Sequence, residues 1–163
     1  MCIRDSSISS SVYQQFSENV IGAAKVYISA INGIGGDDVR LSKRKYLGTK
    51  RLRGFKSGKV GPLDGTDHVG GNYAAAVNIE ANLPKLLPES TNTDINLFLD
   101  FGNIWGVDYD SSIDDSNKLR SSTGVAASWL SPGGPMTFIF SSDISKATTD
   151  ETESFNFQLG TTF

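Results

Sequence analysis

Cysteine is almost absent from this 163-residue chain, and Cys2 is the only one. A single cysteine cannot form an internal disulfide framework, and it cannot supply the clustered thiolates of a structural zinc site. Histidine is equally rare, because His68 stands alone in the sequence. No residue near His68 suggests a catalytic triad or a zinc site, so we interpret it as a bystander and expect neither enzymatic activity nor a cofactor.

Long hydrophobic runs are also missing. No stretch approaches the roughly 18 apolar residues of a membrane-spanning helix, which excludes that class of membrane protein. Strands of a membrane β-barrel alternate apolar and polar residues, so the mean hydropathy of -0.21 does not exclude a barrel. The net charge of -3 argues against nucleic-acid binding by the whole chain.

The first six residues, Met1–Ser6, lack the apolar core and small-residue cleavage site of a signal peptide. They resemble a non-native head that recurs in assembled sequence data, and we leave them out of the fold prediction. A barrel without its own export signal is expected to be cut from a longer protein.

Strict alternation of apolar and polar residues is the main feature that is present. Between Asn72 and Leu83 the odd positions are mostly apolar and the even positions mostly polar or small, ending at Pro84. Such alternation predicts half-buried strands, and no segment has the 3.6-residue period of a helix. The predicted strands lie at 6–16, 19–31, 72–83, 95–105, 119–129, 136–144 and 155–163.

The polar faces of these strands favour a membrane barrel over a soluble sandwich. They carry mostly Ser, Asn, Gly and Ala, whereas a sandwich usually exposes charged residues. Short Pro-rich connections alternate with long charged ones, as in outer-membrane barrels. Aromatic residues near strand ends fit an interfacial girdle: Tyr73, Trp105, Trp129 and Phe163.

About seven strands cannot close a barrel, and open edges are not tolerated in hydrocarbon. The predicted fold is therefore all-β, an antiparallel meander forming the C-terminal part of a transmembrane β-barrel, with 1–163 as one domain. A β-sandwich is the alternative.

The loop 41–70 interrupts this pattern. Eight of the 15 Lys and Arg residues fall between Lys43 and Lys59. Loops of this length are usually functional or disordered. Glu80 and Asp100 lie on the polar faces of the next two strands, so we predict that Arg53 reaches both carboxylates inside the barrel. The alternative is a solvated Arg53 with the two acids paired elsewhere.

For two neighbours of Arg53 the sequence gives weaker evidence of a functional role. Gly54 permits close backbone approach or positive φ, and Phe55 packs either on the barrel wall or as an ordinary loop aromatic. The basic run itself is usually a solvated surface, and it has few interleaved aromatics for nucleic-acid binding. The acidic stretch 108–115 hints at calcium, but Ile113 and Leu119 stand where an EF-hand needs Gly and Glu, so we interpret it as a solvated loop.

Several of these segments together resemble the outer-membrane assembly-factor superfamily. Leu52-Arg53-Gly54-Phe55 resembles its signature lumenal loop, with Leu in place of the commoner Val or Ile. The other similar segments are Gly70-Gly71-Asn72, Asn78-Ile79-Glu80, Phe98 to Trp105, Ser131-Pro132-Gly133-Gly134-Pro135 and Phe155 to Phe163.

The resemblance implies a barrel of roughly sixteen strands that folds and inserts other outer-membrane proteins. It implies a lumenal loop, with Arg53, Gly54 and Phe55, that is clasped to the barrel wall through Glu80 and Asp100 of the adjacent strands. It also implies a lateral seam at the last strand, with Phe155, Phe157, Leu159 and Phe163 on its apolar face. The implied partners are unfolded outer-membrane proteins, outer-membrane lipid and assembly-complex lipoproteins, the last mainly through periplasmic domains absent here.

Other functions remain open at this stage. A transporter of the same superfamily, either TamA-like or a two-partner secretion pore, is the main alternative. A passive porin is disfavoured by the Arg53 loop, and a lumenal hydrolase by the lack of a Ser/His/acid set. The number of periplasmic POTRA repeats upstream would discriminate best among the superfamily members.

Overall fold

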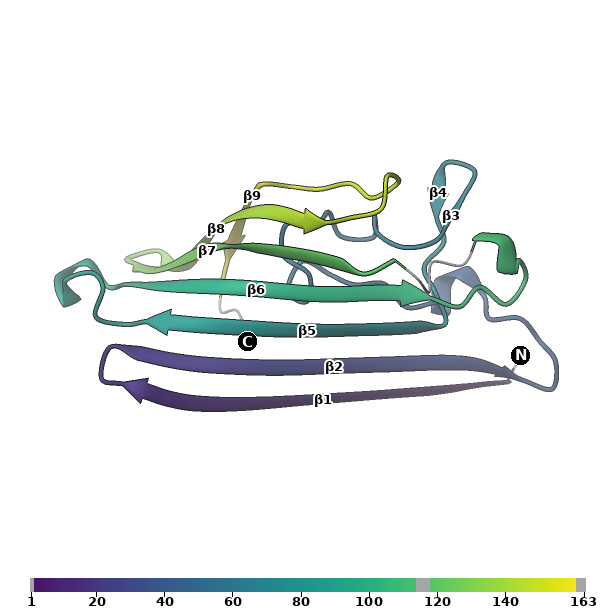
Figure 1. Ribbon diagram of the computed structural model, residues 1–163, viewed down its shortest axis with the longest axis horizontal. Helices are drawn as coiled ribbons and strands as arrows, with labels where there is room; N and C mark the ends of the chain where they lie inside the picture. Colours follow the sequence, from purple (N-terminus) through teal and green to yellow (C-terminus); the bar gives the residue numbers. More distant parts are fainter. Residues whose placement is uncertain (1, 114–117, 161–163) are drawn as a thin grey trace.

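Seven antiparallel strands form one sheet in the computed structural model, which describes residues 2–113 and 118–160 (Figure 1). Each strand pairs with its neighbours along the chain, apart from a small hairpin inserted after the second strand. This arrangement is the predicted meander. The strands are β1 (Cys2–Ser17), β2 (Val20–Ile34), β5 (Tyr73–Leu83), β6 (Thr93–Trp105), β7 (Arg120–Ser131), β8 (Gly134–Ser145) and β9 (Phe155–Leu159).

Helical structure in the described residues is limited to three short 3₁₀ turns, η1 (Leu41–Lys43), η2 (Glu89–Thr91) and η3 (Ser111–Ile113). The expectation of almost no helix is confirmed. None of the helices in the described part of the chain is long and apolar enough to cross a membrane.

Strand boundaries differ from the predictions mainly at the N-terminal end. β1 begins at Cys2 and pairs with β2 from Cys2↔Ile34 onward, so residues left out of the prediction continue the ladder. β2 correspondingly runs to Ile34, beyond the end of the predicted strand at Ile31, because its partner strand satisfies the backbone groups of the extra residues.

The inserted hairpin consists of β3 (Leu63–Asp64) and β4 (Asp67–His68). Strands of two residues are too short to show alternation, so the sequence does not predict them. His68 lies on β4, in this hairpin. The predicted last strand extends to Phe163, whereas β9 ends at Leu159, and Phe163 lies outside the described residues.

Apolar side chains on one face of the sheet are exposed. We call this the outer face, and no second sheet covers it in the described part of the chain. The sandwich alternative is therefore wrong, because a sandwich buries this face. Large exposed residues on the outer face are Val26, Ile28, Val77, Ile79, Leu97, Val125, Trp129, Phe140, Phe155, Phe157 and Leu159.

The core lies on the opposite, inner face, between the sheet and the loop 41–70. Four loop residues, Leu47, Leu52, Phe55 and Val60, pack against Ala74, Ala76 and Ile104 of the sheet. Small strand residues make room for the loop, since a Cβ at Gly102 would lie 2.9 Å from Leu47 Cδ1. Burying a Leu or Phe side chain stabilises by about 1.5–3 kcal/mol, so this cluster holds the loop on the sheet.

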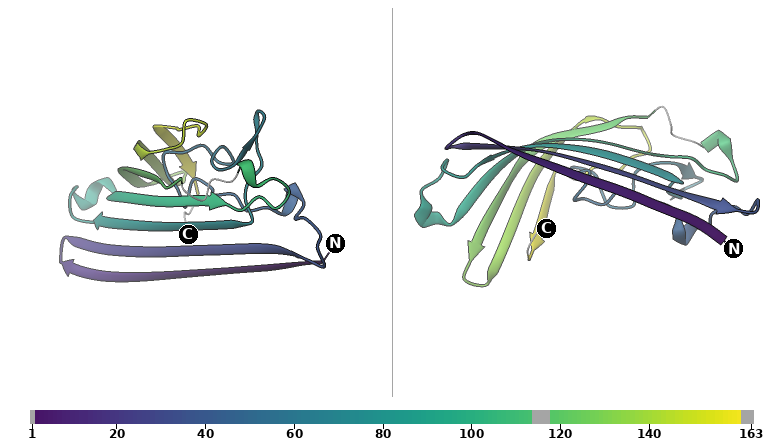
Figure 2. Two further views of the ribbon diagram at one scale, coloured as in Figure 1. Left: turned by 45° about the vertical axis from the view of Figure 1, so that its right-hand side comes forward. Right: turned by 90° about the horizontal axis from the view of Figure 1, so that it is seen from below.

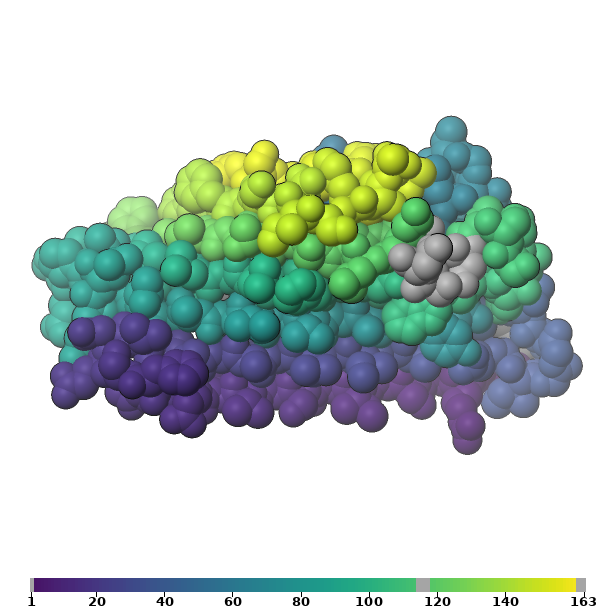
Figure 3. Space-filling model, viewed as in Figure 1, coloured from purple at the N-terminus to yellow at the C-terminus, as the bar shows by residue number. Residues whose placement is uncertain are grey.

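The sheet is twisted and curved rather than flat. Seen from below in Figure 2, β7, β8 and β9 swing away from the direction of β1 and β2. In Figure 3 the strands form a continuous band from purple to yellow, and the β3–β4 hairpin projects at one end. The loop therefore sits within the concave side of a bent sheet.

Candidate functional site

The loop is fixed to the inner face by Arg53 at its centre. Arg53 Nε lies 2.7 Å from Asp100 Oδ2, and Nη2 lies 2.7 Å from Asp100 Oδ1. The Arg53 backbone N–H also donates to Asp100 Oδ2 at 3.0 Å. Asp100 is fully buried and Arg53 is 8% exposed, so this bidentate pair is shielded from solvent. Such bidentate pairs between a guanidinium and a carboxylate stabilise the contact and also fix the relative orientation of the two side chains.

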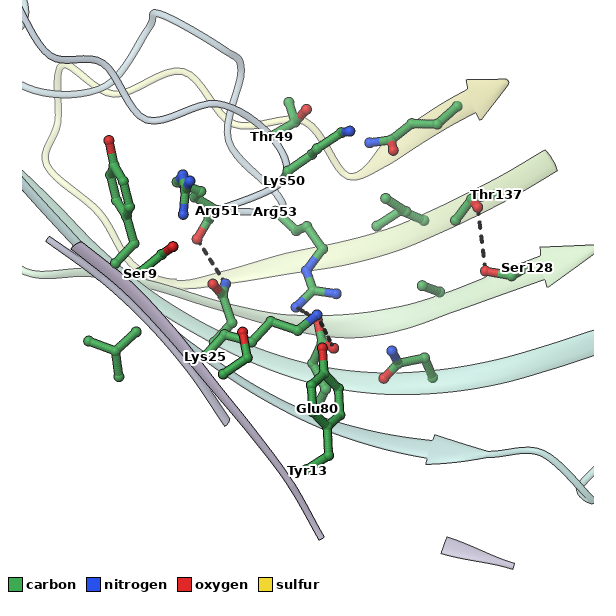
Figure 4. Close-up of a pocket in the computed structure, with 18 of the residues that line it drawn as sticks. Ser9, Tyr13, Lys25, Thr49, Lys50, Arg51, Arg53, Glu80, Ser128 and Thr137 are labelled. Carbon is green, nitrogen blue, oxygen red and sulfur yellow. Dashed lines mark hydrogen bonds and ion pairs between the residues drawn. The ribbon is translucent and has the colours of Figure 1, made fainter. Parts of the chain in front are cut away.

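Glu80 completes the arrangement from the neighbouring strand. Glu80 Oε1 lies 2.8 Å from Arg53 Nη2, and its other oxygen lies 2.8 Å from Lys25 Nζ of β2 (Figure 4). We call Arg53, Glu80 and Asp100 the arginine clasp. Two cations meet two carboxylates here, and of the four only Lys25 has an exposed side chain, 38% accessible. The alternative of a solvated Arg53 does not match this geometry.

Neighbouring residues support the clasp from three sides. Asn78 Nδ2 donates to Asp100 Oδ1 at 2.8 Å and to the Arg51 carbonyl at 2.9 Å. Ser122 Oγ of β7 donates to the Arg53 carbonyl. The guanidinium carbon lies 3.9 Å from the centroid of the Phe98 ring. The sequence analysis does not include Asn78, Ser122 and Phe98 among the predicted site residues. Each nevertheless occupies a strand position whose side chain faces the inner side of the sheet.

Gly54 and Phe55 follow Arg53 into the packed layer. Gly54 has φ 87°, and a Cβ there would lie 3.2 Å from the Cβ atoms of Ser122 and Ser141. Glycine is therefore required both by conformation and by close approach. Phe55 is 2% exposed and belongs to the loop cluster, so it packs on the barrel wall.

A second anchor holds the entrance of the loop. Arg44 pairs with Asp108, and Asp108 Oδ2 also accepts from the Val39 amide at 2.6 Å and from Asn72 Nδ2 at 3.1 Å. Burial raises the pKa of Asp108, but the Val39 and Asn72 hydrogen bonds and the charge of Arg44 outweigh it. The pKa of this carboxyl therefore lies below its ordinary value of 3.8.

Most of the basic run is engaged by acids. Five of its eight cations form ion pairs, and Arg51 stacks on Tyr27 with its guanidinium carbon 3.4 Å from the ring centroid. The buried cations Arg44 and Arg53 hold the loop in place, whereas the exposed pairs of the other three cations contribute little. The run does not present a continuous cationic surface. The paired cations are Arg44, Lys45, Arg53, Lys56 and Lys59.

Beside the clasp, the inner face is hollowed by a cavity of about 480 Å³. Polar residues from β1, β2, β5, β6, β7, β8 and β9 line it, among them Ser9, Asn96, Ser128 and Gln158. The Asn96 and Asn156 side-chain oxygens are buried and have no hydrogen-bond partner in the described part of the chain.

The predicted seam residues lie on β9. Phe155 and Phe157 are on its outer face, with ring centroids 5.1 Å from those of Phe140 and Phe138. Leu159 shares this face and is 69% exposed. β9 pairs only with β8 among the described strands, and its other edge carries no ladder there. The seam itself stays a prediction.

Two further predicted segments are partly described. In the acidic stretch, Asp110 Oδ1 accepts from the backbone N–H and the hydroxyl of Ser112. Asp114 and Asp115 lie outside the described residues. Arg120, which is not among the predicted site residues, is fully buried and paired with Asp150. Asp150 follows no strand pattern, so the sequence gives no signal for this pair.

Known families and proteins resemble the chain along most of its length. The Omp85 superfamily domain matches residues 5–163. "Outer membrane protein assembly factor BamA" of Neisseria meningitidis serogroup B is 34% identical over 143 residues, covering 71% of this chain and 18% of that protein. The BamA of Neorickettsia risticii is 30% identical over 135 residues, covering 81% of this chain and 18% of that protein.

A solved structure has the same fold. The crystal structure of BamA from Haemophilus ducreyi lacking POTRA domains 1-3 superposes with a TM-score of 0.81 at 24% identity. It covers 95% of this chain, which spans 34% of that chain. The chain thus spans about a fifth of the length of the curated relatives it matches.

Proposed function

The chain belongs to the Omp85 superfamily, and on that premise we propose that its protein folds other β-barrels and inserts them into the outer membrane. The sheet is part of an outer-membrane β-barrel, in keeping with the assembly-factor name of its relatives. In this proposal residues 1–163 are the C-terminal part of the barrel, and the loop 41–70 lies in its lumen. No covalent chemistry and no cofactor are involved.

The observation that carries the proposal is the buried arginine clasp. A loop that is packed on the inner face and pinned there by a buried bidentate ion pair narrows the open path that a passive pore needs. An assembly factor needs a rigid interior beside a wall that opens, because substrate strands must be templated on a free edge. We propose that β9 provides one side of that seam, with Phe155, Phe157 and Leu159 toward lipid.

The partners follow from this role. Unfolded outer-membrane proteins pair with the β9 edge through backbone hydrogen bonds, and outer-membrane lipid contacts the outer face. Assembly-complex lipoproteins bind mainly through periplasmic domains outside this chain. Nucleic acid is not a partner, because the basic run is engaged in ion pairs.

Complementation tests the proposal. The full protein containing this chain is expressed in cells depleted of their own assembly factor, and client barrels are scored by heat-modifiable gel mobility. We expect client folding to be restored by the wild-type protein and to fall at least fivefold for Arg53→Ala. Lys50→Ala, an exposed change on the same loop, is the matched control and should restore fully.

Failure of the wild-type protein to restore client folding, while it is itself folded in the membrane, would overturn the proposal. The same cells distinguish the transporter alternative. A two-partner secretion pore or a TamA-like transporter would export its dedicated passenger without restoring the general set of barrels.

A further inference from the structure

A second buried ion pair lies outside the arginine clasp, between β7 and the loop 146–154. Arg120 Nε lies 2.8 Å from Asp150 Oδ2, and Nη2 lies 3.0 Å from Oδ1. Both side chains are fully buried. Arg120 Nη1 also donates to Asn103 Oδ1 at 2.7 Å and to the Lys118 carbonyl at 3.1 Å. The pair is therefore fixed in one geometry from β6 and β7.

Asp150 connects three parts of the molecule. Besides Arg120, its carboxylate accepts from the Ala147 amide of its own loop at 2.8 Å. It also accepts from the Gly61 amide of the lumenal loop at 3.4 Å. A carboxylate bound in this way orients the backbone on both sides of it, because each donor must keep its direction.

Beyond Asp150 the two loops run side by side and share a short ladder. The Lys56 amide donates to the Glu151 carbonyl at 3.0 Å, and the Glu151 amide donates to the Lys59 carbonyl at 3.1 Å. The Glu153 amide donates to the Gly54 carbonyl at 2.9 Å. Phe55 and Thr152 form an antiparallel bridge between these bonds.

One end of this ladder, the Gly54–Glu153 rung, adjoins both functional elements. On the lumenal-loop side, Gly54 is adjacent in sequence to Arg53 of the clasp. On the opposite side, Glu153 is two residues before β9 begins at Phe155. Ser141 of β8 holds the intervening turn, because its amide donates to the Ser154 carbonyl at 2.9 Å and its hydroxyl to the Glu153 carbonyl at 3.0 Å.

We propose that Arg120 and Asp150 are positioning residues that fix the loop 146–154 as a rigid connection between the lumenal loop and β9. Movement of the lumenal loop is then transmitted to the last strand through the Gly54–Glu153 ladder. The inference rests on the proposed function in one respect. In that function β9 pairs with substrate strands, so movement transmitted to β9 would control substrate pairing. Neither comparison nor sequence pattern assigns a role to this pair.

Hydrogen–deuterium exchange on the full protein in lipid nanodiscs tests the connection. We expect Asp150→Asn to accelerate amide exchange at least tenfold at Lys56, Glu151 and Glu153 and at the start of β9. Exchange in β5 should stay within twofold of wild type. The matched control is Lys56→Gln, which removes only the exposed Lys56–Glu151 pair and should stay within twofold at all these amides.

A double variant keeps the test possible if the single variant misfolds. If Asp150→Asn does not fold, the double change Arg120→Gln with Asp150→Asn removes both charges, leaves no unpaired one buried, and is measured in the same way. Arg53→Ala should also accelerate exchange at Glu153, on the far side of the ladder. Acceleration that is confined to 146–150, or that spreads evenly over all strands, would overturn the connection. Because no client is present, this outcome is independent of the complementation result.

Discussion

At the scale of single residues, the two acids around Arg53 are not equivalent. Asp100 is fully buried and receives both ends of the guanidinium fork, whereas Glu80 shares its charge with Lys25 at the edge of the cavity. Removing one partner of a buried pair costs about 3–5 kcal/mol, and less where water can reach the remaining charge. The cost should therefore depend on which acid is changed.

We expect Asp100→Asn and Arg53→Ala to destabilise the docked loop by about 3–5 kcal/mol, and Glu80→Gln by clearly less. The measurement is the rate at which a nonspecific protease cleaves the loop in outer-membrane vesicles. Lys50→Ala serves as the control. Equal cleavage rates for Arg53→Ala and the control would show that the clasp does not hold the loop.

Gly54 offers a separate test of close packing. Gly54→Ala combines a positive φ with Cβ contacts of 3.2 Å, whereas Gly58→Ala has φ 72° and no atom within 4 Å. Both variants lose about 1–2 kcal/mol from the left-handed backbone alone. Gly54→Ala should be the less stable of the two by chemical unfolding, and equal losses would argue against the close approach.

The residues of the clasp could be predicted because strand parity places Glu80 and Asp100 on one face. Arg53 is a loop residue without periodicity, so its pairing with these acids is predicted from its fork of donors and strengthened by the resemblance. The Arg120–Asp150 pair could not be predicted in the same way, because Asp150 lies in an irregular loop. Its partner is set by how that loop folds in space, and local sequence does not encode this.

At the scale of elements, the loop 41–70 is held at its entrance by a titratable anchor. The pKa of Asp108 is lower in the folded chain than its ordinary value of 3.8, so the carboxylate stabilises the docked entrance fully above that pH. This stability is lost as the pH falls through the lowered pKa. The entrance should therefore remain ordered until the pH drops below about 3.8.

Spin labelling measures this directly, with a label at Lys43→Cys in a Cys2→Ser background. The label should gain mobility only below that pH in the wild-type loop. Asp108→Ala should give a mobile label at neutral pH, and the mobility of that label should not change further as the pH falls below about 3.8. A wild-type transition near pH 6 would mean that another group controls the entrance.

Among the elements, alternation was a sufficient guide to the seven strands of the sheet. It failed for the β3–β4 hairpin, and the first residues of β1 are not predicted because the fold prediction leaves them out as a non-native head. In both places backbone pairing, and not a buried face, determines the structure. Cys2 pairs with Ile34 although its neighbours show no consistent parity.

At the scale of the whole molecule, the position of charge indicated the architecture. Charged residues are concentrated in loops, and inner faces carry small polar residues, which is unlike a soluble sandwich. The structure adds what composition does not specify, namely that the small residues accommodate a packed loop. The core of this sheet is therefore supplied by loop 41–70, and its apolar outer face is left for lipid.

Accessibility of spin labels in lipid vesicles tests this two-faced arrangement most directly, in a Cys2→Ser background of the full protein. Labels replacing Val77, Ile79, Leu97 and Val125 on the outer face should collide with lipid-soluble oxygen and be shielded from a water-soluble nickel chelate. Labels replacing Asn96 and Ser128 beside the cavity should show the reverse. Nickel access to the outer-face labels equal to that at Ser128, or protection of those labels from both reagents, would contradict the account.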